Sequence, residues 1–279
     1  MEQFYSLQKL LTVMIGFPVI PLAIVGCGND IPIGENVTTK EEFQIYSKVY
    51  GDSQDIVEKH PTQLLFTVTV PSLGTELSVI VNNWFKKAEI LDPVTNLYIT
   101  TLSTRLGYAE FQLLNYAQAL EALHRRVFGG KYMSDEEYEP ICSDLTNSIP
   151  KTMSEDHRNS LKSRIKYGNE FSQRKRIKEL LDEVWEDCLD QFIDKRSKFI
   201  GNVIGTRNYL VHYDESSASE AVFGTEIFYL AERLKVLLVT HLLIQLGIPK
   251  ENVYRAVKQF DPFNYLKFRD KTHVNTDID

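Results

Sequence analysis

Three polar side chains suited to chemistry on a phosphate stand within six residues, in the stretch RNYLVH at 207–212. Arg207 can neutralise phosphate charge, and His212 can exchange a proton near neutral pH, which is what metal-free cleavage of RNA requires. On a helix, Asn208 lies one turn from His212 and can hydrogen-bond its imidazole. The structural alternative is that Arg207 pairs with a carboxylate and His212 caps a helix end.

Helix geometry limits what this motif can do within one chain. Arg207 and His212 lie roughly 7.5 Å apart along a helix axis and about 140° apart around it. They cannot form one tight pair on a straight helix, but they can flank a common cleft, especially if the helix frays near Asp214 or a second copy faces it. Gly201 and Gly205 precede them at a spacing that permits a close helix crossing, either at a dimer seam or within the bundle.

A basic block forms a second candidate site. Residues 158–178 hold eight Lys or Arg and one acid, Glu170. We expect a phosphate-binding surface, with Tyr167 and Phe171 available to stack on bases. The cations with few local acids are Arg158, Lys162, Arg164 and Lys166.

The alternative for this block is a solvated helix face. The acidic stretch that follows it offers partners four residues away, such as Glu179 for Lys175 and Asp182 for Lys178. This pairing would consume the second half of the block and leave the first half free.

The surrounding pattern is mainly helical. We expect a helix over 3–16, strands over 17–26 and 64–70 and a short helix near 39–49, then helices from residue 75 onward, including one over 218–247. The chain thus divides into an α/β segment over 1–74, a helical domain over 75–260 and a polar tail over 261–279.

Composition favours an ordinary globular protein without a bound metal or cofactor. The chain has 279 residues, a net charge of −7 and three widely separated cysteines. No zinc-ligand spacing and no nucleotide-binding glycine motif occurs. The scattered cysteines fit a reducing compartment, so we expect a cytoplasmic protein, and we expect no membrane span. Residues 10–28 leave open a different interpretation, a lipoprotein cleaved just before Cys27, although the positive start of a signal peptide is missing.

The motif and its neighbours resemble the ApeA-like HEPN family of bacterial anti-phage ribonucleases. The resemblance rests on RNYLVH, on QALEALHRR at 118–126 and on LAERLKVLLVTHLLIQLGI at 230–248, and it is strongest over 75–258. Residues 1–74 resemble only the last part of that family's N-terminal region. The resemblance implies a HEPN helical bundle that dimerises and cleaves RNA without a metal or other cofactor.

Carried onto this sequence, the resemblance gives Arg207 and His212 the catalytic places and Asn208 the polar place between them. Glu121 is a weaker, supporting candidate: it either points toward Arg207 or pairs with Arg125 on its own helix. His124 is expected to be a half-buried polar residue. A non-catalytic module that binds RNA or protein remains the rival interpretation.

Overall fold

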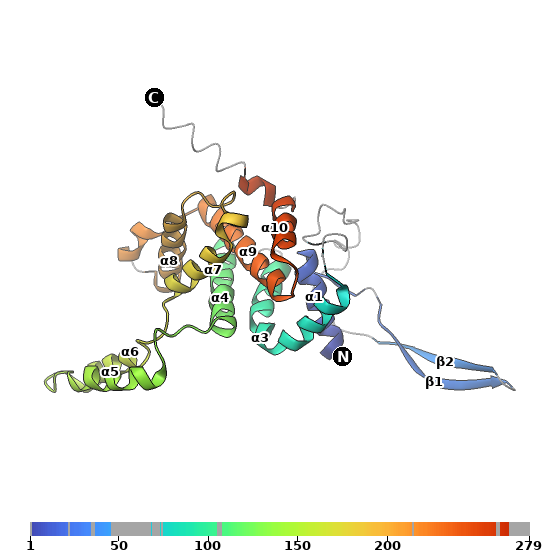
Figure 1. The fold of residues 1–279 in the computed structure, drawn as a ribbon, viewed down its shortest axis with the longest axis horizontal. Helices are drawn as coiled ribbons and strands as arrows, with labels where there is room; N and C mark the ends of the chain where they lie inside the picture. Colours follow the sequence, from blue (N-terminus) through green and yellow to red (C-terminus); the bar gives the residue numbers. More distant parts are fainter. Residues whose placement is uncertain are drawn as a thin grey trace, which may run out of the picture.

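A computed structural model describes the chain over residues 2–21, 23–34, 37–45, 68, 73, 75–104, 108–213, 215–260 and 263–267. The fold is mainly α, as the sequence predicts, with one two-stranded antiparallel sheet among these residues. Figure 1 shows a central helical bundle from which two hairpins project, one of helices and one of strands. No helix in the described ranges is long and apolar enough to cross a membrane.

The bundle is organised around α9 (Thr225–Gln245), which is buried on nearly every side. It packs most extensively on α4 (Ala109–Val127), and also on α10 (Lys250–Gln259) and α1 (Glu2–Ile15). The predicted helix over 218–247 was too long at its start, because Gly224 has a φ of 58° and separates α9 from the preceding turn. Gly247, with a φ of 84°, follows its end as predicted.

The helix α3 (Leu77–Ser103) continues through Pro93 without a break. Proline cannot donate to the carbonyl four residues earlier, which leaves the Glu89 carbonyl without its helical partner. Arg126 of α4 supplies the missing donors: its Nη2 lies 2.8 Å from the Glu89 oxygen and its Nε 2.7 Å from that of Ile90. This interhelical contact explains why the helix survives the proline.

The motif lies on α8 (Arg196–His212), which follows α7 (Gln173–Val184) and a short π-helical turn, η3 (Trp185–Leu189). Both α7 and α8 pack on α4 and on each other. After α8 the chain turns at Tyr213, whose φ of 49° is left-handed, and forms the 3-10 helix η4 (Glu215–Glu220). Thus α4, α7 and α8 form the framework that positions the motif.

The two glycines of α8 have different surroundings. A Cβ at Gly205 would lie 2.2 Å from the carbonyl oxygen of Glu220, whereas one at Gly201 would meet nothing within 4 Å. Gly205 therefore allows η4 to pack closely on α8, and the neighbouring Thr206 hydroxyl accepts the Val222 amide at 3.0 Å. The close crossing at Gly205 is within the chain.

The helical hairpin of α5 (Asp135–Asn147) and α6 (Glu155–Lys166) projects from the bundle (Figure 1). Neither helix contains a fully buried residue, and the two pack mainly on each other. Ser134 begins α5 with a capping box completed by Glu137. The hairpin is thus an exposed arm inserted between α4 and α7.

The N-terminal segment partly corrects the sequence prediction. The helix α1 is confirmed, but the strand β1 (Val25–Gly34) begins near the end of the predicted strand over 17–26, and residues 17–21, 23 and 24 are not buried. The predicted helix near 39–49 falls largely on the strand β2 (Val37–Gln44), which pairs with β1. Cross-strand pairing outweighed the local helical pattern here. Apart from Val68, the predicted strand over 64–70 lies outside the described residues, as does most of the tail.

Replacing each glycine of α8 by alanine should have opposite effects on the free energy of unfolding. Gly205→Ala should lower it by about 1–3 kcal/mol, because the new methyl group collides with the Glu220 backbone. Gly201→Ala should raise it by up to about 1 kcal/mol, because alanine favours the helix and meets open space. Urea unfolding of both variants provides the measurement, and equal effects would contradict this account of the α8–η4 contact.

Candidate functional site

Arg207 lines a cleft between α4 and α8. The cleft has a volume of about 590 Å³, and Glu121 and Arg125 of α4 line it together with Arg207. The guanidinium group is half-buried, and among the described residues no carboxylate forms an ion pair with it. Its cationic group is therefore available to an anion that enters the cleft.

The hydrogen bond expected between Asn208 and His212 is replaced by another. The Asn208 Oδ1 accepts from Arg207 Nη1 at 3.2 Å, which engages the amide oxygen with the arginine and not with the imidazole. A guanidinium can only donate hydrogen bonds, and the amide oxygen of Asn208 is an acceptor. Asn208 thus orients Arg207.

His212 is the last residue of α8, and its side chain is exposed. It does not line the cleft that contains Arg207. An aromatic cluster holds the end of this helix, with the Tyr209 ring 5.2 Å from Phe223 and 5.7 Å from Tyr213. Within one chain the two principal motif residues therefore face different surroundings, as the helical geometry predicts.

Both predictions for Glu121 describe part of its environment. Its Oε1 accepts from Arg125 Nε at 3.1 Å, the pairing expected within the helix, and its side chain also lines the cleft with Arg207. Arg125 forms a further ion pair with Glu170, and the hydrogen bond from Arg125 holds the pKa of Glu170 below its usual value. Two acids thus compensate the charge of Arg125.

His124 and Arg176 form a buried polar cluster that the sequence did not predict. Each residue is only 1% exposed, so His124 is buried and not half-buried as expected. Arg176 Nη1 donates to the Gly129 carbonyl at 2.7 Å, Nη2 to that of Gly130 at 3.2 Å, and Nε to that of Phe171 at 3.1 Å. Burial lowers the pKa of this guanidinium, and the three carbonyls accept from three of its five N–H groups.

The position of this cluster gives it a structural role. Gly129 and Gly130 are where the chain leaves α4 for the projecting arm, and Phe171 is where it returns to α7. Arg176 therefore anchors both connecting segments of the arm, the one that follows α4 and the one that precedes α7, to the bundle. A Cβ at Gly130 would lie 2.3 Å from Arg176 Nη1, so the glycine leaves room for the guanidinium.

Hydrogen-bond direction fixes the tautomer of His124. Arg176 Nη1 lies 3.2 Å from His124 Nδ1 and can only donate, so Nδ1 must accept. The proton is then on Nε2, which donates to Glu179 Oε2 at 2.7 Å. Lys175 pairs with the same carboxylate at 2.7 Å, as the sequence predicted. Burial opposes ionisation of Glu179, but these hydrogen bonds lower its pKa overall.

The four predicted RNA-contacting cations all lie on the projecting helix α6. Arg158, Lys162 and Lys166 follow at intervals of four residues and share one face, whereas Arg164 lies on another. Lys162, Arg164 and Lys166 are exposed, and within the described ranges none of the four forms an ion pair. The second half of the block is used differently: Arg176 is buried, and Asp182 pairs with Arg196 and not with Lys178.

The two aromatic residues of the block also differ. Tyr167 is 58% exposed and can contact a ligand. Phe171 is half-buried, with its ring 4.8 Å from that of Tyr132 and with Lys175 Nζ 4.2 Å from the ring centre. Internal packing therefore occupies Phe171, and only Tyr167 remains suited to stacking on a base.

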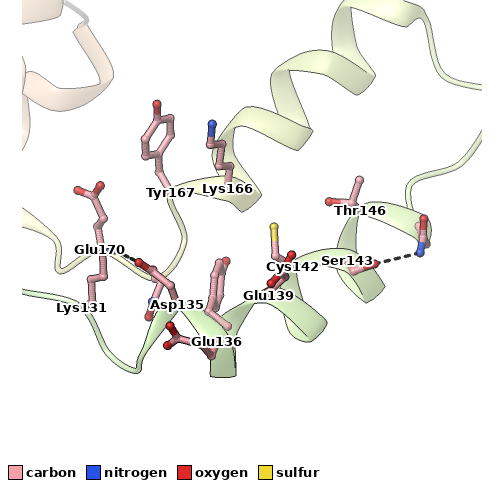
Figure 2. A pocket seen from close by; sticks show the side chains of 13 residues that line it. Lys131, Asp135, Glu136, Glu139, Cys142, Ser143, Thr146, Lys166, Tyr167 and Glu170 are labelled. Carbon is pink, nitrogen blue, oxygen red and sulfur yellow. Dashed lines mark hydrogen bonds and ion pairs between the residues drawn. The ribbon is translucent and has the colours of Figure 1, made fainter.

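A second cleft, of about 660 Å³, lies at the base of the arm. Figure 2 shows Lys166 and Tyr167 on one side of it and Glu139 and Cys142 of α5 on the other. Glu170 also lines this cleft. Glu170 forms an ion pair with Arg125, which lines the cleft of Arg207. The two clefts are therefore linked by this ion pair.

The cysteines are separate in the structure as in the sequence. Cys27 is exposed in β1, Cys142 is half-buried, and Cys188 is buried. Among the described residues no group of three or more His, Cys, Asp or Glu side chains is placed to hold a metal ion.

A helical bundle in which one helix ends with an Arg-Asn pair and a His five residues after the arginine defines the structural class. Residues 114–252 match the sequence profile described as Apea-like HEPN, which covers about half of the chain and includes the whole motif. The chain belongs to this family through that domain. No curated protein and no solved structure matches the chain.

Sequence reasoning missed the polar groups that share the cleft with Arg207. Asn115, Gln118 and Gln173 line it, together with Arg125. Asn115, Gln118 and Arg125 lie on one face of α4, because they are spaced three and then seven residues apart. The helical period could have grouped these three, but nothing in the sequence indicated that α8 covers this face.

Replacing Arg176 by methionine should lower the free energy of unfolding by roughly 3 kcal/mol, because three buried carbonyls lose their donor. Arg174→Met is the matched control, since Arg174 is exposed on the same helix and should change stability by less than about 0.5 kcal/mol. Urea unfolding measures both, and equal effects of the two substitutions would contradict the role assigned to Arg176.

Proposed function

We propose that this protein is a metal-independent endoribonuclease of the HEPN type that acts in the cytoplasm in anti-phage defence. The observation that carries the proposal is the Apea-like HEPN domain with its motif intact, and with Arg207 free of any ion pair among the described residues. An unpaired arginine in a cleft is suited to a phosphate, and an exposed histidine nearby is suited to proton transfer.

The proposed reaction divides these roles between Arg207 and His212. His212 assists attack of a ribose 2′-hydroxyl on the adjacent phosphate, or protonates the oxygen that leaves. Arg207 stabilises the additional negative charge that develops on the phosphate. Asn208, by accepting from Arg207, holds the guanidinium in place.

The working site is proposed to contain two chains. In one chain Arg207 lines the cleft and His212 does not, so a single phosphate cannot easily reach both. A two-fold dimer that pairs the ends of two α8 helices would bring the histidine of one chain near the arginine of the other. Closed two-fold dimers present the same patch twice and are the commonest oligomers.

The exposed cations of α6 are proposed to bind the RNA backbone away from the cut. Lys162, Arg164 and Lys166 have no ion-pair partner among the described residues, and Tyr167 beside them is exposed. Their arm projects beyond the bundle, where it can contact a strand that extends past the active site (Figure 1).

Purified protein should cleave single-stranded RNA in EDTA and leave 2′,3′-cyclic phosphate ends, because the attacking group is the 2′-hydroxyl. Arg207→Ala and His212→Ala should each lower the rate by 100-fold or more, roughly the contribution of one acid–base group. Gel analysis of end-labelled RNA and of the product ends gives the measurement.

Arg255→Ala is the matched control, because this exposed side chain lies on α10 and lines neither cleft, and it should retain the wild-type rate. Products with 3′-hydroxyl ends would contradict the mechanism. RNA binding without any cleavage would instead favour a non-catalytic HEPN module.

Neutralising Lys162, Arg164 and Lys166 to glutamine should weaken RNA binding and flatten its dependence on salt. Each lost phosphate contact should reduce the log–log slope by roughly 0.7 for a single strand. Fluorescence anisotropy in the non-cleaving His212→Ala background measures the slope. The exposed cations Lys40, Lys86 and Arg255, neutralised together, should leave it unchanged; identical slopes for the two triple variants would show that α6 is only a solvated face.

A further inference from the structure

The cleft beside Arg207 is built for more than a phosphate. Its floor is one face of α4, and Arg207 and Val211 of α8 form its wall. The volume of about 590 Å³ lies within the usual range of small-molecule sites, about 300–1,000 Å³. The α4 residues that line it are Phe111, Leu114, Asn115, Gln118, Glu121, Ala122 and Arg125.

The groups in the cleft suit a nucleobase. Phe111 offers an aromatic ring that is 42% exposed, with Leu114 and Val211 as apolar neighbours. Gln118 adds an exposed amide, which can both donate and accept hydrogen bonds. A flat apolar surface beside a few converging polar groups is how proteins bind the unstacked bases of single-stranded RNA.

Glu121 adds a directional preference. The hydrogen bond from Arg125 Nε and the ion-pair contact of its Nη2 both reach the same carboxylate oxygen, Oε1, each at 3.1 Å. Among the described residues Oε2 has no partner, so it can accept from a ligand. An ionised carboxylate only accepts, and it repels phosphate, so it matches the amino group on a base edge.

We propose that this cleft binds the base next to the phosphate held by Arg207, and that it prefers bases with an exocyclic amino group over uracil. The proposal rests on the proposed ribonuclease function for the position of the phosphate. Phe111 contacts the face of the base, and Glu121 accepts from its amino group. Paired bases hide these edges, so the substrate class is single-stranded RNA.

The ion pair between Arg125 and Glu170 links the base cleft to the second cleft, which Lys166 and Tyr167 line. Arg125 closes one end of the base cleft and is bonded to Glu170, which lines the cleft that contains Lys166 and Tyr167. A strand that leaves the base cleft past Arg125 therefore reaches the basic helix α6. Arg125 pairs with both acids at this junction and offsets part of their negative charge.

The test measures binding separately from cleavage. The His212→Ala protein is titrated into fluorescent ten-nucleotide strands of A, C or U, and into an A–U duplex, with anisotropy as the readout. We expect oligo(A) and oligo(C) to bind more tightly than oligo(U), and the duplex to bind most weakly. Phe111→Ala should weaken binding of all three strands roughly tenfold.

Glu121→Gln should bring the affinities for C and U to within about twofold, because glutamine can donate to a uracil carbonyl as well as accept. The matched controls are Phe85→Ala, whose ring is also 42% exposed but lies on α3, and Glu251→Gln on α10. Both controls should retain the affinities of the parent protein.

The outcomes separate this inference from the proposed function. If wild-type protein cleaves RNA but Phe111→Ala and Glu121→Gln leave affinity and base preference unchanged, the inference is overturned and the function stands. If nothing is cleaved but binding depends on both residues as expected, the inference stands and the nuclease function fails. If Phe111→Ala changes the oligomeric state, measured as the molecular mass in solution, and leaves RNA affinity unchanged, the cleft is a contact between chains. This outcome also overturns the inference.

Discussion

The buried guanidinium of Arg176 is the interaction on which the arrangement of the site depends. It binds backbone carbonyls from the end of α4 and from the start of α7, and it contacts His124 within α4. These contacts fix α7 against α4 at the point where the arm is inserted. Gln173 and Arg125, which lie next to this junction, line the cleft of Arg207. The geometry of that cleft therefore follows from a residue that does not line it.

Charge compensation continues outward from this buried centre. His124 donates a hydrogen bond to Glu179, which also forms an ion pair with Lys175. Arg125 forms ion pairs with both Glu121 and Glu170. Among the described residues Arg207 stands apart from this network, because its only polar contact is with an uncharged amide. A cation left without an acid beside a network of paired charges is the feature that makes the cleft suited to an anionic ligand.

Much of the helical part could be predicted from local signals. Gly129 and Gly130 end α4, Ser134 begins α5, and the period of the apolar residues identifies α8 and α9 as packed helices. The strand pair near the N-terminus could not be predicted in place, because pairing across the hairpin decides its extent. The continuation of α3 through Pro93 could not be predicted either, because Arg126, which supplies the missing donor, lies on another helix.

The candidate site divides in the same way. The types and order of Arg207, Asn208 and His212 indicated their chemistry, and helix geometry indicated that they diverge. The partner of Asn208 and the burial of Arg176 could not be predicted, since both depend on which groups the fold brings together. Arg176 stands in a run of cations that local composition assigns wholly to the surface.

The central claim is that one catalytic site takes residues from two chains, and subunit complementation tests it most directly. Arg207→Ala and His212→Ala chains are mixed under conditions that allow subunits to exchange, and RNA cleavage is measured before and after mixing. The account predicts that mixed dimers regain partial activity, because one of their two composite sites keeps both residues. A wild-type protein that cleaves RNA fully while remaining monomeric at assay concentration would contradict it.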